Sequence, residues 1–149
     1  MLQTLIVAIG ADCCVSSSAA ESHGSMLVSA TVRPVATLEQ QSEPVAITLS
    51  AQDVERGFID ISDPTQLRVH SNSREGYIIE LLAVSPMFSS IAVHGLGSDV
   101  TLGAEGGSIV QRWDRAQSVS LALTFRLKLA AGLQPGQYPW PLRMRVRAL

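Results

Sequence analysis

Three histidines are the first residues of this chain that could ligate a metal ion. His23, His70 and His94 lie far apart and show no spacing typical of a ligand pair. Because a zinc site needs three or four converging ligands, this distribution does not favour one. His70 alternates with Val69 and is predicted to face solvent on a strand, whereas His94 precedes a glycine in a predicted loop. We therefore predict no metal site built on histidine.

Four acidic residues that fall close together are the second candidate for chemistry. They are Asp53, Glu55, Asp60 and Asp63. Calcium prefers several oxygen ligands from one loop, and paired carboxylates can also hydrolyse glycosides. However, the calcium-loop pattern D-x-[DN]-x-[DN]-G is absent, and spacing along the chain does not place two carboxylates across a cleft. We interpret Asp53 as the cap of a turn and the other three as solvated side chains.

The serine, glycine and cysteine residues form no recognisable enzyme motif. Serines occur at residues 16–18 and on either side of Asn72, but no G-x-S-x-G elbow is present. The Gly-Leu-Gly of residues 95–97 lacks the following helix that a phosphate-binding loop requires. The two cysteines, Cys13 and Cys14, lie in a segment predicted to be removed. We expect a protein that is not an enzyme and binds no cofactor.

Three aromatic residues could form a platform on which a sugar ring stacks. They are Trp113, Tyr138 and Trp140, the last two within Tyr-Pro-Trp-Pro. The alternative is packing, with Trp140 over the end of the core and its flanking prolines protecting a strand edge. The platform interpretation makes a carbohydrate-binding or other ligand-binding module of the periplasm or cell surface the alternative function.

The first 20 residues resemble a secretory signal peptide. They contain a short apolar stretch, residues 5–9, and end in Ser18, Ala19 and Ala20. No Lys or Arg precedes the apolar stretch and Asp12 follows it, which a start site within a longer signal would explain. An ordinary strand over residues 2–9 is the alternative. The apolar stretch is far shorter than the roughly 20 residues that cross a membrane. We predict cleavage of residues 1–20 and export to the periplasm or surface of a Gram-negative bacterium.

Residues 21–149 have the size and composition of one globular domain. The whole chain has 149 residues, of which 46% are hydrophobic, enough for a core. Its formal net charge of −2 gives no basic surface for nucleic acid. Cleavage after Ala20 would leave no cysteine, and so no disulfide.

The C-terminal third carries the clearest strand pattern. Apolar residues alternate with mostly polar ones along residues 118–129, at Val119, Leu121, Leu123, Phe125, Leu127 and Leu129. After a predicted turn at residues 133–136, Leu142, Met144 and Val146 alternate with arginines. Successive strand side chains point to opposite faces. We therefore predict a long terminal hairpin with one apolar face, which a second sheet must cover.

Similar but shorter patterns precede this hairpin at spacings typical of β-sandwiches. Strands are predicted over residues 26–32, 45–49, 58–61, 67–71, 77–84, 91–93, 100–102 and 109–110. Polar turns are predicted at residues 39–44 and 62–65, and a hairpin-type loop at 71–76. Residues 51–57 could be one helical turn ending at Gly57 or a tight loop. The fold class expected is all-β, an antiparallel immunoglobulin-like β-sandwich of about seven to nine strands.

Three stretches carry a resemblance to a known family. They are residues 51–61, residues 67–77 with the pattern V-x-S-N-x-x-x-G-Y, and residues 133–138 with P-G-x-Y. Together they resemble bacterial exported subunits of the chaperone–usher fimbrial group, especially spore-coat-U-like and related small pilin-like proteins. The resemblance extends patchily over residues 45–149. In such families P-G-x-Y opens the final strand.

The resemblance implies a structural or assembly role in a bacterial fimbria or related cell-envelope system. A pilin-like domain lacks one strand, and a neighbouring subunit or a periplasmic chaperone supplies it as an extended segment. The donor segment expected here contains Met26, Val28, Ala30 and Val32. The alternative is that these residues form the first strand of a complete sandwich. Other subunits, a chaperone or further copies of the same chain are the partners implied.

Overall fold

The computed structural model describes residues 27–113 and 117–149. The chain divides into two units, Met1–Thr31 and Val32–Leu149, and the fold below is that of the second. The predicted signal peptide, both cysteines, His23 and Met26 lie outside the described residues.

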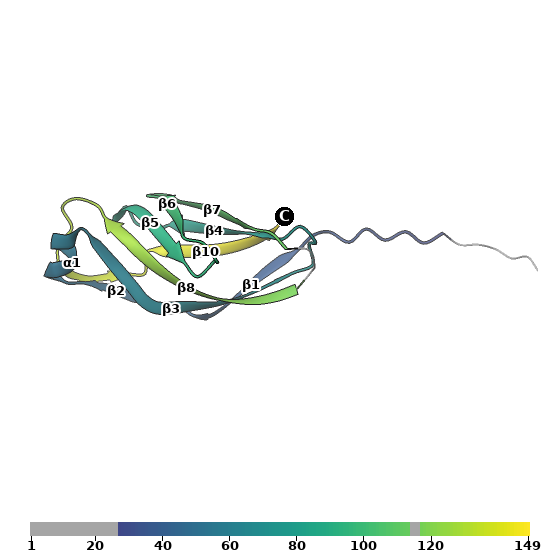
Figure 1. The fold of residues 1–149 in the computed structure, drawn as a ribbon, viewed down its shortest axis with the longest axis horizontal. Helices are drawn as coiled ribbons and strands as arrows, with labels where there is room; N and C mark the ends of the chain where they lie inside the picture. The colour runs from purple at the N-terminus through teal and green to yellow at the C-terminus, as the bar shows by residue number, and fades with distance from the viewer. Residues whose placement is uncertain (1–26, 114–116) are drawn as a thin grey trace, which may run out of the picture. The chain divides into compact units, whose positions relative to one another are not determined.

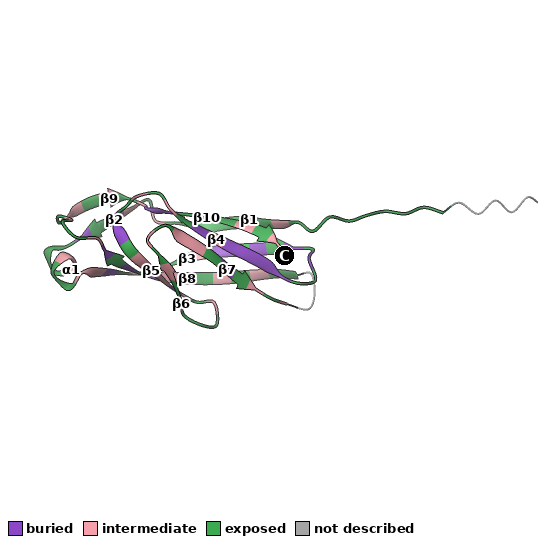
Figure 2. Ribbon diagram, turned by 90° about the horizontal axis from the view of Figure 1, so that it is seen from above, coloured by how far each residue is buried: buried purple, intermediate pink, exposed green. Residues whose placement is uncertain are grey.

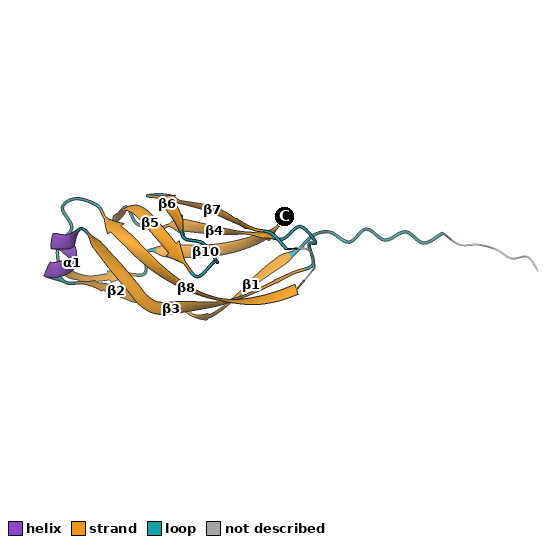
Figure 3. Cartoon of the chain, in the orientation of Figure 1, coloured by secondary structure: helices purple, strands orange, loops and turns teal. Residues whose placement is uncertain are grey.

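Ten strands and one short helix make up the described part of the chain (Figure 3). They are β1 (Ala36–Ser42), β2 (Ala46–Leu49), α1 (Ala51–Arg56), β3 (Phe58–Ser71), β4 (Tyr77–Ala83), β5 (Phe88–His94), β6 (Val100–Gly103), β7 (Gly106–Gln111), β8 (Gln117–Leu129), β9 (Gly136–Pro139) and β10 (Leu142–Ala148). The all-β prediction is confirmed. The strand number exceeds the predicted seven to nine, since β1 and β9 were not predicted as strands.

Eight of the strands form one antiparallel sheet, in the order β1-β3-β8-β5-β6-β7-β4-β10, and β2 pairs separately with β9. The sheet curls until its outermost strands, β1 and β10, approach each other around a shared core (Figure 1). The result is a nearly closed all-β sandwich.

The alternation along β8 places its apolar residues in the core, as predicted. Leu123, Phe125 and Leu127 are each at most 1% exposed. β8 is hydrogen-bonded along both edges, to β3 and to β5. β4, predicted to be covered on both faces, begins with three buried residues (purple in Figure 2), but Leu82 near its end is 39% exposed. The prediction therefore holds only for the first half of β4.

The predicted terminal hairpin does not form. β10 pairs with β4 in register Leu142↔Ala83, whereas β8 lies between β3 and β5. Between them comes β9, which pairs with β2. The alternation predicted each strand and its buried face correctly, but alternation carries no information on which strands are neighbours.

The predicted turn at residues 62–65 is instead part of a single 14-residue strand, β3. Its register against β8 shifts between Ile61 and Thr65, which marks a bulge. Pro64 lies within the bulge. Its backbone has no N–H, but a residue in a bulge does not need to donate a hydrogen bond to the neighbouring strand. β8 accordingly pairs with both halves of β3, and two predicted strands become one.

The predicted polar turn at residues 39–44 is mostly strand as well. β1 runs through Glu39 to Ser42 and pairs with β3, with its last four residues exposed. A strand at the edge of a sheet tolerates polar residues because its outer side faces water. The polar residues 39–42 therefore belong to an edge strand and not to a turn.

The helical alternative for residues 51–57 is confirmed. Ser50 and Asp53 form a capping box, in which each side chain binds the other residue's backbone N–H. Gly57 ends the helix in the left-handed conformation, with φ of 77°. The helix lies beside β2 at one end of the unit (Figure 1).

Candidate functional site

The loop of residues 72–76, here called the crossover loop, connects β3 to β4. It was predicted as a hairpin-type loop, but β3 pairs with β1 and β8, whereas β4 pairs with β7 and β10. The loop therefore carries the chain between strands that are not neighbours. It also contains most of the V-x-S-N-x-x-x-G-Y pattern on which the family resemblance rests.

Asn72 in the crossover loop fixes the chain just before β1. Its side-chain Oδ1 accepts a hydrogen bond from the Val35 N–H at 2.6 Å, and its Nδ2 donates to the Arg33 carbonyl at 3.1 Å. Its backbone N–H donates to the Val35 carbonyl at 3.1 Å. Pro34 has no N–H and cannot continue the β1 ladder, so the Asn72 side chain replaces that pairing.

Ser73 connects the crossover loop to the C-terminal strand. Its hydroxyl donates to the Leu149 carbonyl at 2.9 Å and accepts from the Glu75 N–H at 3.2 Å. Its carbonyl accepts from the Trp113 indole N–H at 2.9 Å, and its own N–H donates to the Ser71 hydroxyl at 3.1 Å. Because Ser73 is only 5% exposed, these partners replace the water that it lost on burial.

Gly76 and Tyr77 complete the pattern for packing reasons. Gly76 has φ of 118°, and a Cβ there would lie 2.0 Å from the Gln111 carbonyl oxygen, so only glycine fits. The Tyr77 ring packs against Trp113 with centroids 4.7 Å apart, and burial raises the pKa of the Tyr77 hydroxyl. Hydrogen bonds and packing contacts of the loop thus explain the residues of this pattern.

The P-G-x-Y pattern opens β9 at Gly136, and the Tyr138 hydroxyl donates back to the Gln134 carbonyl at 2.8 Å. After Trp140 and the buried Pro141 the chain resumes as β10. The pattern therefore opens the short strand β9 and not the final strand, β10, which follows it.

The three aromatic candidates do not share one neighbourhood. Trp113 follows β7 and contacts Tyr77, whereas Trp140 follows β9 and packs against Phe125 with centroids 5.9 Å apart. The C-terminal end and β9 lie at opposite ends of the unit (Figure 2). These contacts favour the packing interpretation of the two tryptophans. The sugar-stacking role of Trp113, Tyr138 and Trp140 stays a prediction.

The expected donor residues lie before the first strand. The predicted strand over residues 26–32 is wrong for the described residues 27–32, which carry no strand. Val28 is 73% exposed and Val32 is 78% exposed, and Ala30 is exposed too. A donor segment that has not yet bound its acceptor would have these properties: alternating apolar residues, exposed side chains and no backbone pairing with another strand.

β1 and β10 each have one edge that is not hydrogen-bonded to a neighbouring strand. Each has one hydrogen-bonded neighbour, β3 for β1 and β4 for β10. Their Cα atoms come within 8 Å of each other, yet among the described residues no strand pairing joins them. We call this boundary the β1–β10 seam. Its β10 side presents Leu142, Met144 and Val146 toward the core.

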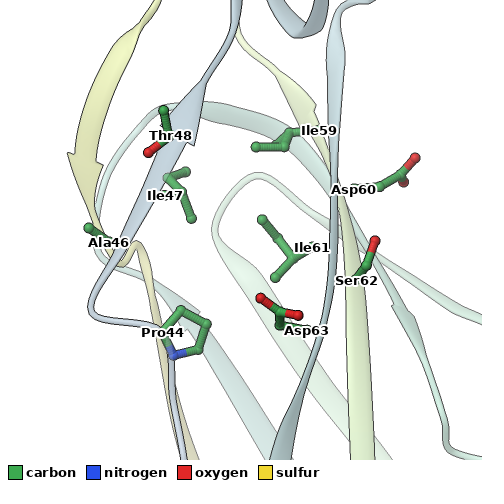
Figure 4. Close-up of a pocket in the computed structure, with 9 residues that line it drawn as sticks. All are labelled: Pro44, Ala46, Ile47, Thr48, Ile59, Asp60, Ile61, Ser62 and Asp63. Carbon is green, nitrogen blue, oxygen red and sulfur yellow. The ribbon is translucent and has the colours of Figure 1, made fainter.

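A second opening lies beside the first half of β3, beyond the point where β1 ends. β1 ends at Ser42 opposite Gln66, and β2 then pairs with β9, so the first half of β3 has β8 as its ladder partner but not β1. Figure 4 shows the resulting pocket of about 350 Å³, with Ile47 of β2 facing Ile59 and Ile61 of β3. Asp63 lines the same pocket.

The acidic candidates do not converge on an ion. Asp53 serves the capping box and pairs with Arg56, and Asp60 accepts from the Arg126 Nε at 2.6 Å. Hydrogen bonds from Ser50 lower the pKa of Asp53, and the hydrogen bond from Arg126 lowers that of Asp60. In residues 27–113 and 117–149 no three metal-ligating side chains form a group. His70 is exposed as predicted. The prediction that His94 lies in a loop is wrong, because it is the last residue of β5, where it contacts Asp99 at 2.7 Å.

No protein-family model, no curated protein and no solved structure matches this chain. The fold and the contacts above are therefore the basis for any functional conclusion. No helix in the described ranges is long and apolar enough to cross a membrane.

One group of residues was not singled out from the sequence. Arg126 and Lys128 on β8 lie beside Phe58 of β3 and Arg56 of α1, around a shallow cavity. The signal was present as the polar side of the β8 alternation, where two successive outward residues are basic.

Proposed function

We propose that this chain is a non-enzymatic structural or assembly component of a bacterial surface fimbria or related cell-envelope system, acting after export. Copies would join by strand addition, in which the segment of residues 26–32 of one copy enters the β1–β10 seam of the next. The observation that carries the proposal is that β1 and β10, the two outermost strands of a nearly closed sheet, lie close together but are not paired by backbone hydrogen bonds.

The chemistry of both sides suits strand addition. Main-chain N–H and C=O groups along β1 and β10 would bond to the entering backbone. Alternate residues of the donor, Val28, Ala30 and Val32, would face the core beside Met144 and Val146. Each buried methylene contributes about 0.8 kcal/mol, so burial of these three side chains would add to the stabilisation that the backbone hydrogen bonds supply.

The seam must widen to accept a strand. Neighbouring strands lie about 4.8 Å apart, so an intervening strand needs roughly 10 Å between β1 and β10, whereas their Cα atoms now come within 8 Å. Each of the two strands has one ladder partner, but β1 contains no buried residue whereas β10 buries Leu142 and Met144, so β1 is the element better able to move. A chaperone that keeps the seam open is consistent with this requirement.

Cross-linking between copies tests the proposal directly. Residues 21–149 contain no cysteine, so single substitutions can be introduced without background. Val28→Cys protein mixed with Val146→Cys protein should form a disulfide-linked dimer under mild oxidation. Val28→Cys mixed with Val110→Cys, at an exposed position of β7, should not.

Removing residues 21–33 is the second test. Light scattering coupled to size exclusion should find oligomers of residues 21–149 and monomers of residues 34–149. Monomers of both proteins at all concentrations, with no specific cross-link and no capture by a fimbrial chaperone, would contradict the proposal.

A further inference from the structure

The outer face of the sheet holds a group of basic side chains around a hollow, which the proposed assembly does not use. The strands β3, β8, β5 and β6 lie side by side there. One cross-strand row contains Phe58, Lys128 and Ser90, and the next contains Asp60, Arg126, Ala92 and Thr101. Arg56 of α1 reaches the same place.

The hollow exists because β5 carries small side chains between longer ones. Ser90 and Ala92 are flanked by Lys128 and Arg126 on β8, and Thr101 stands on the other side. The cavity has a volume of about 330 Å³, near the lower end of the range for small-molecule sites. Its lining combines the apolar Ala92 and Phe58 with the basic side chains of Arg56, Arg126 and Lys128.

Two of the cations are held in place before any ligand arrives. The guanidinium carbons of Arg56 and Arg126 lie 5.0 and 4.8 Å from the centroid of the Phe58 ring, within cation–π range. Asp60 accepts from two nitrogens of Arg126, and Asp53 pairs with Arg56. A guanidinium has five N–H donors, so donors remain on both arginines.

Positive charge dominates the cavity. Three cations face two carboxylates, and among the described residues Lys128 makes no ion pair. The cavity therefore carries a local excess of positive charge, although the chain as a whole has a net charge of −2. Immobilised donors lose less entropy on binding, which favours a ligand that presents oxygen anions.

We infer that the cavity between Arg56, Arg126 and Lys128 binds the acid group of an anionic sugar. The cations would contact the carboxylate or sulfate oxygens. The hydroxyls of Ser90 and Thr101 would bond to sugar hydroxyls, and the Ala92 methyl with the edge of Phe58 would receive the apolar side of the ring. A bare anion would use the cations but neither the hydroxyls nor the apolar residues, so the mixed lining favours the sugar acid.

Titration of the full chain with a trisaccharide of galacturonic acid tests this inference. Amide resonances of Phe58, Ser90, Ala92 and Lys128 should shift with increasing ligand, and the apparent affinity should fall with added salt. Lys128→Gln should weaken binding about fivefold, because it removes one charged contact and leaves the fold intact. Arg143→Gln removes an equally exposed cation from β10 and should leave binding unchanged.

Two comparisons keep the inference open to refutation. A neutral galactose trisaccharide should bind at least tenfold more weakly, and inorganic sulfate should bind more weakly than the acidic trisaccharide. Equal binding of sulfate and trisaccharide, unchanged resonances at these positions, or equal loss from Lys128→Gln and Arg143→Gln would overturn it. None of these results depends on whether copies assemble by strand addition.

Discussion

Val35 and Asn72, 37 positions apart, are joined by hydrogen bonds in both directions. The Val35 N–H donates to the Asn72 Oδ1 at 2.6 Å, and the Asn72 N–H donates to the Val35 carbonyl at 3.1 Å. An asparagine side chain here occupies the place of a strand neighbour. It marks the boundary between residues 27–35, which carry no strand, and the sheet.

Asn72→Ala should destabilise the fold by about 1–2 kcal/mol, since two side-chain hydrogen bonds are lost at a partly solvated position. Urea denaturation followed by circular dichroism measures the change. Arg74→Ala in the same loop is the control and should change the free energy of unfolding by less than about 0.5 kcal/mol. Equal effects of the two substitutions would contradict the role given to Asn72.

Gly76→Ala should be severe, with a loss of about 3 kcal/mol or more. Its φ is 118°, and the new Cβ would lie 2.0 Å from the Gln111 carbonyl oxygen and 2.8 Å from the Arg112 Cα. Gly97→Ala is the matched comparison, with φ of 83° and nothing within 4 Å of its Cβ. That substitution should cost only about 1 kcal/mol, from backbone conformation alone. The difference between the two melting temperatures isolates the clash.

Phe125→Ala should cost about 3–5 kcal/mol, because it opens a cavity in the centre of the core. Phe125 is 1% exposed and packs against Trp140. Val110→Ala, at a position 48% exposed, should cost well under 1 kcal/mol. A small effect of Phe125→Ala in equilibrium denaturation would mean that the core lies elsewhere.

Stability should decline in acid partly through Asp60. The hydrogen bond from Arg126 lowers the folded-state pKa of Asp60 below its ordinary value of 3.8. The unfolded chain therefore takes up the proton first, so the stabilisation is complete above pH 3.8 and is lost as the pH falls through the lowered pKa. Because both side chains are well exposed, screening by water keeps the contribution small. Asp60→Asn should flatten the change in urea midpoint between about pH 6 and pH 3.

Val28→Asp combined with Val32→Asp should abolish assembly without unfolding the subunit. Both side chains are largely exposed in the single chain, so the free energy of unfolding should change by less than about 0.5 kcal/mol. In the seam of another copy each carboxylate would be buried without a partner. Sedimentation velocity should find only monomers, and persistence of the oligomer would place the contact elsewhere.

The sequence predicted the strands better than it predicted their neighbours. Leu123, Phe125 and Leu127 alternate with polar residues, and each is buried as expected. Burial depends on residue type and local spacing, which are both visible in the sequence. Strand order depends on contacts distant in the chain, and so the pairing of β10 with β4 rather than β8 was not predicted.

Breaks in the pattern were the other source of error. Pro64 was interpreted as a turn, but a bulge accommodates it within β3. The polar residues after Leu38 were also interpreted as a turn, but they form an exposed edge strand. In both cases a local signal for interruption was outweighed by pairing with a long neighbouring strand.

The candidate sites were only partly visible in the sequence. The apolar alternation of Val28, Ala30 and Val32 was recognised, but the sequence left open whether it formed a donor segment or a first strand; in the structure residues 27–32 carry no strand. The basic cavity depends on Arg56 and Arg126 meeting at Phe58, residues brought together by a helix and two strands. No spacing rule connects them.

The positions of the two tryptophans give the chain a pair of built-in optical reporters. Trp113 rests on Tyr77 near the crossover loop, and Trp140 rests on Phe125 beside β9. Replacing one by phenylalanine leaves emission from the other alone. Fraying at either end could then be followed separately, and the two signals would reveal whether the molecule melts in one step or from one side first.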